Sequence, residues 1–325
     1  MVKEKALSQR ESLQQLLGIR FPVLVAPMFL ISNASMVIEA LNAGATAAIP
    51  ALNYRTDVAL REAVNEIRQK SQGPFGFNLI VNKSNPAMKR QLETLCELRV
   101  DYIITSLGSP AEVIKRCKPL GIKVFCDVVN LSYAQKVEAM GADALIAVGS
   151  EAGGHCGPVS NNILLPQLVK HCHIPVIAAG GIGSSDQIAR MLEMGAAGVS
   201  VGTVFIASEE APVSMAYKKA LIDFSAKDIV LSSKLSGSPL TVINTEYVQK
   251  IGTKASLLEK LMKQNKWLKK YLKMIIFARG MKKITRSAFS ATYQTVWVAG
   301  PSIDFVHSVR PLREIMHELV SDFQS

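Results

Sequence analysis

The sequence has 325 residues and a formal net charge of +11. With 49% apolar residues, a chain of this length can bury a large core, either as one large domain or as one domain with an appendage. No apolar run approaches the ~20 residues of a membrane-spanning helix, and residues 1–20 are too polar for a secretory signal. Five cysteines lie far apart without a Cys-x-x-Cys pair, which indicates a reduced, cytoplasmic protein rather than a disulfide-linked one.

Short apolar runs alternate with stretches of helical periodicity over residues 21–208. The runs that predict buried strands are 23–28, 46–52, 75–80, 102–106, 123–128, 144–148, 175–179 and 198–201. Helices are predicted between them over 34–43, 57–69 (with Asp57 as its N-cap), 86–98, 110–118 and 132–140. Such strand–helix units build parallel sheets. They favour an α/β fold of the (β/α)8 TIM-barrel type, and an open doubly wound sheet is the alternative because periodicity does not show closure.

The sequence changes character after residue 208. The elements predicted there are a helix over 211–223, a polar, turn-rich connection over 232–245, and a closing helix over 311–323. We therefore divide the chain into an N-terminal lead-in over 1–20, a barrel core over 21–208, and a C-terminal helical cap over 209–325. The cap is expected to lie over the strand ends, where barrel active sites are found.

A basic segment lies within the predicted cap. Residues 254–286 contain eleven lysines and arginines and one acidic residue, so they carry almost all of the net charge. Leu257, Leu261 and Leu268 share one helical face. The cations, with aromatic residues between them, could bind an acidic lipid surface, an acyl carrier protein or RNA, and the alternative is a solvated cap helix.

Glycines cluster directly after the last three predicted strands. They occur in the stretch 149–157, at Gly180-Gly181, and at Gly202 before Thr203. Glycine lets the backbone approach a ligand closely and present N–H groups to an anion. In a (β/α)8 barrel, the loops after the seventh and eighth strands commonly bind phosphate. Gly180, Gly181, Gly202 and Thr203 are therefore predicted to hold a phosphate group, and tight strand–helix turns without a ligand are the alternative.

His155 is the candidate for chemistry, because it follows two glycines beyond the sixth strand and its ring can project over the barrel mouth. A histidine titrates near neutral pH and can take a proton from a carbon acid. Asp127, at the end of the fifth strand, is a polar candidate for the same site, with a satisfied loop cap as the alternative; Ser106 is another candidate for the pocket wall. Glu151 is expected to hold the glycine turn. The His-Cys-His run at 171–173 predicts no metal site, because alternate residues on a short connection rarely converge on one ion.

Five motifs at strand ends form a specific combination. They are Ala26-Pro27-Met28, Phe75-Gly76-Phe77-Asn78-Leu79, Gly149-Ser150-Glu151-Ala152-Gly153-Gly154-His155, Ala179-Gly180-Gly181-Ile182 and Val201-Gly202-Thr203. Together they resemble the nitronate monooxygenase family and its relative, the flavin-dependent enoyl-acyl-carrier-protein reductase II. The resemblance implies FMN in a βα barrel. The residues that it implies as contacts are Ala26, Pro27 and Met28 along the isoalloxazine, Asn78 at the flavin or its ribityl chain, Gly153 near the flavin, and Gly180, Gly181, Gly202 and Thr203 at the phosphate.

The resemblance also implies an activity, the oxidation of alkyl nitronates or nitroalkanes with dioxygen to a carbonyl compound and nitrite. The alternative is an FMN-dependent reductase that uses NAD(P)H on an acyl thioester. A second alternative is an anionic-surface binder with a vestigial flavin site. The expected partners are a small-molecule substrate and dioxygen, and a homo-oligomer is compatible with the sequence. Relatives usually carry Gln or Glu where this chain has Val148, so a polar contact to the flavin ring is lost or supplied by another residue.

Overall fold

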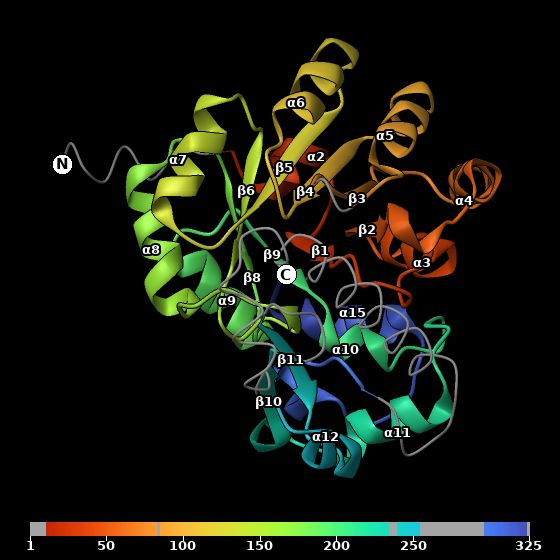
Figure 1. Cartoon of the computed structure of the whole chain (residues 1–325), viewed down its shortest axis with the longest axis vertical. Coiled ribbons are helices and arrows are strands. Elements are labelled where there is room, and N and C mark those ends of the chain that lie inside the picture. Colours follow the sequence, from red (N-terminus) through yellow and green to blue (C-terminus); the bar gives the residue numbers. More distant parts are fainter. Residues whose placement is uncertain (1–10, 83–84, 234–238, 254–295, 324–325) are drawn as a thin grey trace, which may run out of the picture.

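The computed structural model describes residues 11–82, 85–233, 239–253 and 296–323, and within them eight parallel strands close into a barrel (Figure 1). In order around the barrel the strands are β1 (Val23–Val25), β2 (Thr46–Pro50), β3 (Gly76–Ile80), β4 (Tyr102–Ser106), β5 (Lys123–Val128), β6 (Ala144–Val148), β8 (Val176–Ala179) and β9 (Gly198–Val201). The ring closes because β1 pairs with both β2 and β9, with Val25 opposite Ala47 and Val201. The (β/α)8 TIM barrel is confirmed, and the open-sheet alternative is wrong.

Helices follow the strands and lie on the outside of the barrel (Figure 1). They are α3 (Ala34–Asn42), α4 (Asp57–Lys70), α5 (Met88–Glu97), α6 (Ala111–Cys117), α7 (Leu131–Ala139), α8 (Asn161–His171) and α9 (Ser185–Glu193). The predicted N-cap of α4 is wrong by one residue, because Thr56 Oγ1 accepts from the N–H of Ala59 at 3.2 Å. Asp57 is instead the first helical residue, and its carboxylate pairs with Arg61 at 2.7 Å.

Packed side chains fill the barrel interior toward the amino-terminal ends of the strands. Tyr102 and Phe125 stack in the interior with their ring centroids 4.8 Å apart, and the Tyr102 hydroxyl lies 2.8 Å from Thr46 Oγ1. The short helix α2 (Leu13–Leu17) adds Leu13, which is fully buried, to the same interior cluster. Because this end of the barrel is filled by side chains, a ligand can bind only at the carboxyl ends of the strands.

The first two strands are shorter than predicted, because their last residues leave the sheet and form a rim. β1 ends at Val25 since Ser32 Oγ accepts from the N–H of Met28 at 2.8 Å and donates to the carbonyl of Ala26 at 3.2 Å. After β2, residues 51–53 form one turn of 3-10 helix. These local bonds replace the sheet ladder at the barrel mouth.

The C-terminal third contains a small antiparallel sheet, which was not predicted. β10 (Ile229–Ser232) pairs with β11 (Leu240–Ile243), and β11 pairs with β7 (Gly154–His155) from the loop after β6. The prediction of a turn-rich connection over 232–245 is therefore wrong. The physical reason is that Leu240 and Val242 alternate toward a buried apolar cluster that also holds Val248 and Val296. The cap is thus a mixture of sheet and helix, and not helical throughout.

The remaining elements of the C-terminal third connect this sheet to the barrel. They are α10 (Thr203–Ile206), α11 (Met215–Asp223), α12 (Glu246–Ile251), the 3-10 helix η4 (Pro301–Phe305) and α15 (Leu312–Leu319). As predicted, the closing helix α15 packs back on the barrel, against α3 and α9, although it is shorter than 311–323. The basic segment over 254–286 lies outside the described residues. Among the described helices, none has both the length and the apolar character needed to cross a bilayer.

Candidate active site

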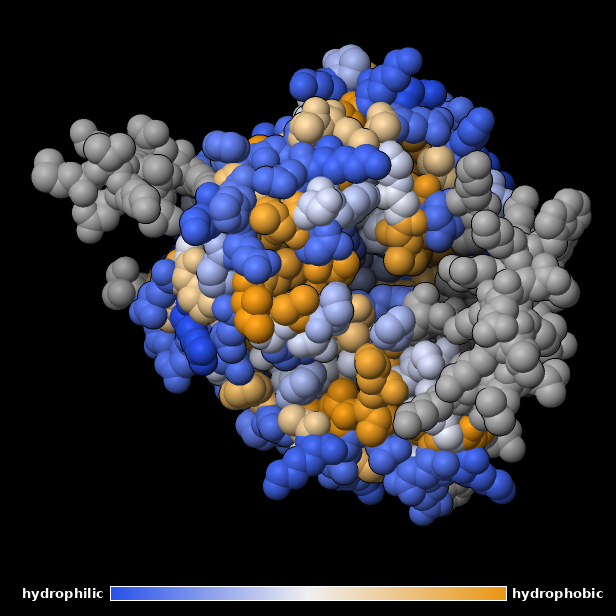
Figure 2. All heavy atoms as spheres, turned by 60° about the vertical axis from the view of Figure 1, so that its left-hand side comes forward, coloured by the Kyte–Doolittle hydropathy of each residue, from blue (hydrophilic) through white to orange (hydrophobic). Residues whose placement is uncertain are grey.

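A cavity of about 550 Å³ lies at the carboxyl ends of the barrel strands and is partly lined by the C-terminal third. This volume is within the range of small-molecule sites, ~300–1,000 Å³. Figure 2 shows a hollowed face with apolar side chains around it. All eleven residues predicted for the site line this cavity: Ala26, Pro27, Met28, Asn78, Asp127, Gly153, His155, Gly180, Gly181, Gly202 and Thr203.

The two glycine turns lie side by side on one wall, since β8 and β9 are neighbours with Ala179 opposite Ser200. Gly180 and Gly181 have φ angles of 115° and 73°, a conformation that favours glycine. A Cβ on Gly180 would lie 2.6 Å from the backbone nitrogen of Ala152. The turn after β8 therefore packs tightly against the loop after β6, which gives Gly180 a structural role whatever the cavity holds.

The same wall carries hydrogen-bond donors that a bound anion could use. Within the described part of the chain, the backbone N–H groups of Gly181 and Ile182 donate to no protein acceptor. Thr203 Oγ1 accepts from the N–H of Gly300 at 3.0 Å, so its own proton remains available. Backbone N–H groups with a hydroxyl beside them are the donor set that phosphate sites use.

On the opposite side of the barrel, polar side chains from β3, β4 and β5 form a hydrogen-bonded chain. Asn78 Nδ2 donates to Ser106 Oγ at 2.6 Å, and Ser106 Oγ donates to Asp127 Oδ2 at 2.5 Å. Desolvation raises the pKa of Asp127 to about 6, and the bond from Ser106 opposes that rise. Asp127 is thus bonded to a neighbouring strand inside the cavity rather than serving as a loop cap.

His155 lies on the edge strand β7 rather than on an open loop. It stands opposite Leu240 of β11, and Thr241 Oγ1 donates to the carbonyl of Ala152 at 2.8 Å, which holds the same segment. His155 lines the cavity and keeps part of its surface in contact with solvent. Desolvation by the surrounding walls lowers the pKa of His155 below 6.5, so the imidazole is neutral at pH 7. A neutral imidazole at the cavity wall can accept a proton from a substrate.

Glu151 supports the glycine turn through a second residue. Its carboxylate accepts from the backbone N–H of Asn161 at 3.4 Å, and Asn161 Nδ2 donates to the carbonyl of Ala179 at 2.8 Å. Asn161 is buried at the start of α8. Sequence reasoning missed Asn161, because polar residues are common at helix starts and its distant partner was not visible.

The comparisons with known proteins agree with this geometry. A sequence model of the nitronate monooxygenase family matches residues 10–322 of the chain. The chain belongs to this family. It is accordingly an oxidoreductase of the flavin-dependent kind.

Relatives of this nitronate monooxygenase family member carry several names. The (3aS,4S,5R,7aS)-5-hydroxy-7a-methyl-1-oxo-octahydro-1H-indene-4-carboxyl-CoA dehydrogenase of Rhodococcus jostii is 31% identical over 242 residues, covering 74% of this chain and 68% of that protein. A probable nitronate monooxygenase of Staphylococcus aureus is 28% identical over 286 residues, covering 74% and 80%. Among solved structures, FabK from Thermotoga maritima superposes with a TM-score of 0.82 at 28% identity, covering 96% of this chain and 95% of that one.

Part of the cavity lining comes from residues that sequence reasoning did not single out. From the C-terminal third they are Tyr217, Leu240, Val296, Val298 and Ser302. Tyr217 stacks on Trp297 with ring centroids 5.6 Å apart, and its hydroxyl donates to the carbonyl of Val298. None of these residues lies in a recognisable motif, so only the fold reveals that they reach the barrel mouth.

The sequence predicts the loss of a polar contact at Val148, and the structure shows which residues surround that position. Val148 and Ile146 are the residues of β6 that line the cavity, so this strand presents apolar side chains to a ligand. On the neighbouring strand β5, Asp127 stands opposite Ile146. A polar contact that Val148 cannot make is therefore available from the adjacent strand.

No group of three or more His, Cys, Asp or Glu side chains that could hold a metal ion occurs in the described ranges. Within the 171–173 run, His173 Nδ1 lies 3.7 Å from the carboxylate of Glu138 on α7. The chain's five cysteines are all in the described ranges and are present as thiols.

Proposed function

We propose that this protein oxidises alkyl nitronates, or nitroalkanes after deprotonation, with FMN as cofactor and dioxygen as oxidant, to give a carbonyl compound and nitrite. The observation that carries the proposal is one cavity in which the predicted FMN contacts meet a neutral imidazole. Its volume and apolar walls suit a flat aromatic cofactor with room for a small substrate. A reducing, cytoplasmic setting belongs to the same proposal, supported by the cysteine thiols.

The donor set and the rim loop support FMN as the flavin. The N–H groups of Gly181 and Ile182 and the hydroxyl of Thr203 would bind the phosphate, since none of these donors is used by another described residue. The loop of residues 26–28 and Asn78 would flank the ring. When bound, FMN would supply the electron transfer between substrate and dioxygen.

His155 would act as the base that accepts the α-proton of a nitroalkane. Its lowered pKa keeps the ring unprotonated at neutral pH, so it has a lone pair to offer a carbon acid. A preformed nitronate needs no such proton transfer. The imidazole would then orient the anion, and its loss should reduce the rate with nitroalkanes more than the rate with nitronates.

The test begins with the absorption spectrum of the purified protein and the identity of the flavin released on denaturation. Anaerobic addition of a nitronate should bleach the flavin, and air should restore it with formation of nitrite. His155→Asn should lose most of the turnover of nitroalkanes, whereas His173→Asn, a change at an exposed histidine outside the cavity, should retain it. A protein that binds no flavin, or whose flavin a nitronate leaves oxidised, would refute the proposal.

A second candidate is an FMN-dependent oxidoreductase that acts on an acyl thioester with NAD(P)H. It is favoured by the name of the Rhodococcus jostii relative, a carboxyl-CoA dehydrogenase at 31% identity. Rapid bleaching of the flavin by NADH or NADPH would support this candidate and count against the first. An acyl carrier protein or acidic lipid partner at residues 254–286 stays a prediction, because that segment lies outside the described residues. A homo-oligomer also stays a prediction.

A further inference from the structure

The cavity wall formed by β5 and β6 carries one carboxyl group beside apolar side chains. Asp127 on β5 stands opposite Ile146 on β6, and Val148 lies two residues further along β6 on the same face. A ring lying against this wall would cover the carboxyl group and remove water from it. The charged form of Asp127 would then lose solvation without gaining a counter-charge from these neighbours.

The hydrogen bonds around Asp127 leave specific groups for a ligand. Ser106 gives its proton to Asp127 Oδ2 and accepts from Asn78 Nδ2. Asn78 Nδ2 also donates to the carbonyl of Ile104 at 3.3 Å, a group that can only accept, so the orientation of the amide is determined. Asn78 Oδ1 is thereby left as an acceptor. The second oxygen of Asp127 is a donor when protonated and an acceptor when ionised.

We propose that Asp127 contacts the bound flavin ring as the neutral acid, so that the protein takes up a proton when the cofactor binds. The inference rests on the proposed function, because it takes FMN as the ligand of this cavity. Asn78 Oδ1 then accepts from the ring and the Asp127 hydroxyl donates to it, which matches a heterocycle that carries both N–H and C=O groups. Asp127 also supplies the polar contact that Val148 cannot make.

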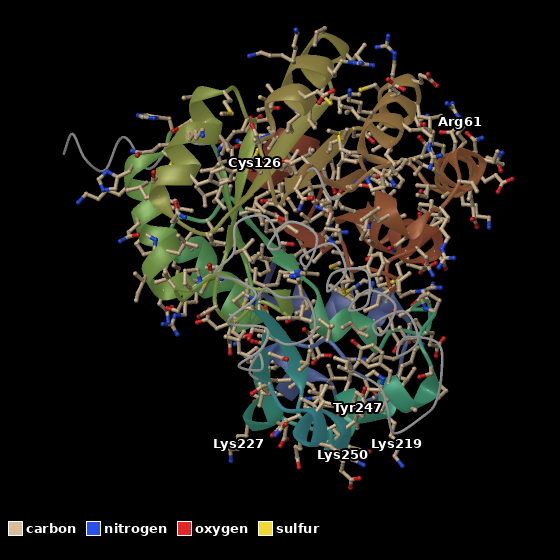
Figure 3. The ribbon with its side chains drawn as sticks, viewed as in Figure 1. Arg61, Cys126, Lys219, Lys227, Tyr247 and Lys250 are labelled. Carbon is tan, nitrogen blue, oxygen red and sulfur yellow. The ribbon has the colours of Figure 1, made fainter. Side chains whose placement is uncertain are left out.

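The groups that face Asp127 allow this proton to be assigned. From α7, Tyr133 donates its hydroxyl to the carbonyl of Gly108, and burial raises the pKa of Tyr133. The adjacent Cys126 lies among the barrel strands in Figure 3, and burial raises the pKa of its thiol to about 12. Lys219, Lys227 and Lys250 lie at the outer edge of the C-terminal third, away from β5 (Figure 3). Near neutral pH, the titrating groups of the described cavity wall are therefore Asp127 and His155.

The experiment measures the Kd of FMN for the apoprotein by quenching of flavin fluorescence, for wild type and Asp127→Asn, between pH 5.5 and pH 8. The ratio of the wild-type Kd to the variant Kd should rise with pH, by about tenfold for each unit by which binding raises the pKa of Asp127. The ratio cancels the second ionisation of the FMN phosphate, at a pKa of about 6, and that of His155, which both proteins share. Asp127→Ser is a second neutral variant whose ratio should rise in the same way.

Asp101→Asn is the matched control. Desolvation raises the pKa of Asp101 as well, but this carboxylate precedes β4 at the other end of the barrel, where it accepts from the N–H of Phe75 at 3.0 Å. Its Kd should follow that of wild type at every pH. A ratio for the Asp127 variants that is constant with pH, or that falls as pH rises, would overturn the inference while leaving FMN as the cofactor. Wild type that binds no FMN at any pH would instead overturn the proposed function.

Discussion

Replacing Gly180 with alanine tests whether the close approach of the loops after β6 and β8 holds the cavity wall together. The φ of 115° costs a residue with a side chain about 1–3 kcal/mol. Its Cβ would lie 2.6 Å from the nitrogen and 2.9 Å from the Cα of Ala152, whose carbonyl accepts from Thr241 Oγ1. Overpacking against such a fixed neighbour costs about 1–3 kcal/mol more. We expect Gly180→Ala to lower the free energy of unfolding by roughly 2–6 kcal/mol.

Two other glycines separate the contributions to this loss. Gly121 has a φ of 72° and no atom within 4 Å of an added Cβ, so Gly121→Ala should cost only the conformational strain, about 1 kcal/mol. Gly202 has a negative φ, and its nearest neighbour would be Ala26 Cβ at 3.5 Å, an ordinary contact. Gly202→Ala should therefore change stability by less than about 0.5 kcal/mol. If FMN phosphate binds at this turn, Gly202→Ala should weaken FMN binding at unchanged stability.

The assay is urea unfolding of the flavin-free proteins, followed by circular dichroism, with midpoints compared at equal slopes. The order of stability should be wild type and Gly202→Ala together, then Gly121→Ala, then Gly180→Ala. If Gly180→Ala is as stable as Gly121→Ala, the loop after β6 moves aside at little cost. The reasoning that glycine is required there for packing would then be refuted.

Three further predictions concern single side chains. Thr241→Val removes the donor to the carbonyl of Ala152 and should lower the free energy of unfolding by about 1 kcal/mol in the same urea assay; an unchanged midpoint would show that this bond contributes nothing. Ser106→Ala removes the bond that lowers the pKa of Asp127, so carboxyl NMR titrations of both proteins should give a higher Asp127 pKa in the variant than in wild type. An equal or lower pKa in the variant would contradict the assigned donor. The kcat/KM for a nitroalkane should fall on the acidic side of the usual histidine range, because burial lowers the pKa of His155 and the imidazole loses its free lone pair once it is protonated. A profile with the same acidic limb in His155→Asn would assign that limb to another group.

The barrel core was largely predictable because its signals are local. The bounds of β4 and β5 match the predicted runs 102–106 and 123–128, since a buried parallel strand is a continuous apolar run between turns. The glycine turns were also visible, because Gly180 and Gly202 directly follow such runs. Their placement on one wall followed from the general rule that parallel strands end at the same edge of the barrel.

The C-terminal third was less predictable because its signals are not local. β11 is short, and its register is determined by pairing with Gly154 and His155, far away in the sequence. Gly300 packs against Gly153 and donates its N–H to Thr203 Oγ1, and both partners are far away in the sequence. A short strand or a single glycine has no periodicity of its own, so such contacts leave no pattern to read.

By itself, the sequence determined the alternation of strands and helices, the positions of the glycine turns, and the residue types that could bind a phosphate or move a proton. These properties depend on neighbouring residues along the chain. Only the tertiary structure decided that the sheet closes, that His155 is held on a strand, and that Asp127 lines the cavity on the strand next to Val148. The physical reason is that each of these facts depends on hydrogen bonds and burial between distant segments, which the fold creates and which no local pattern specifies.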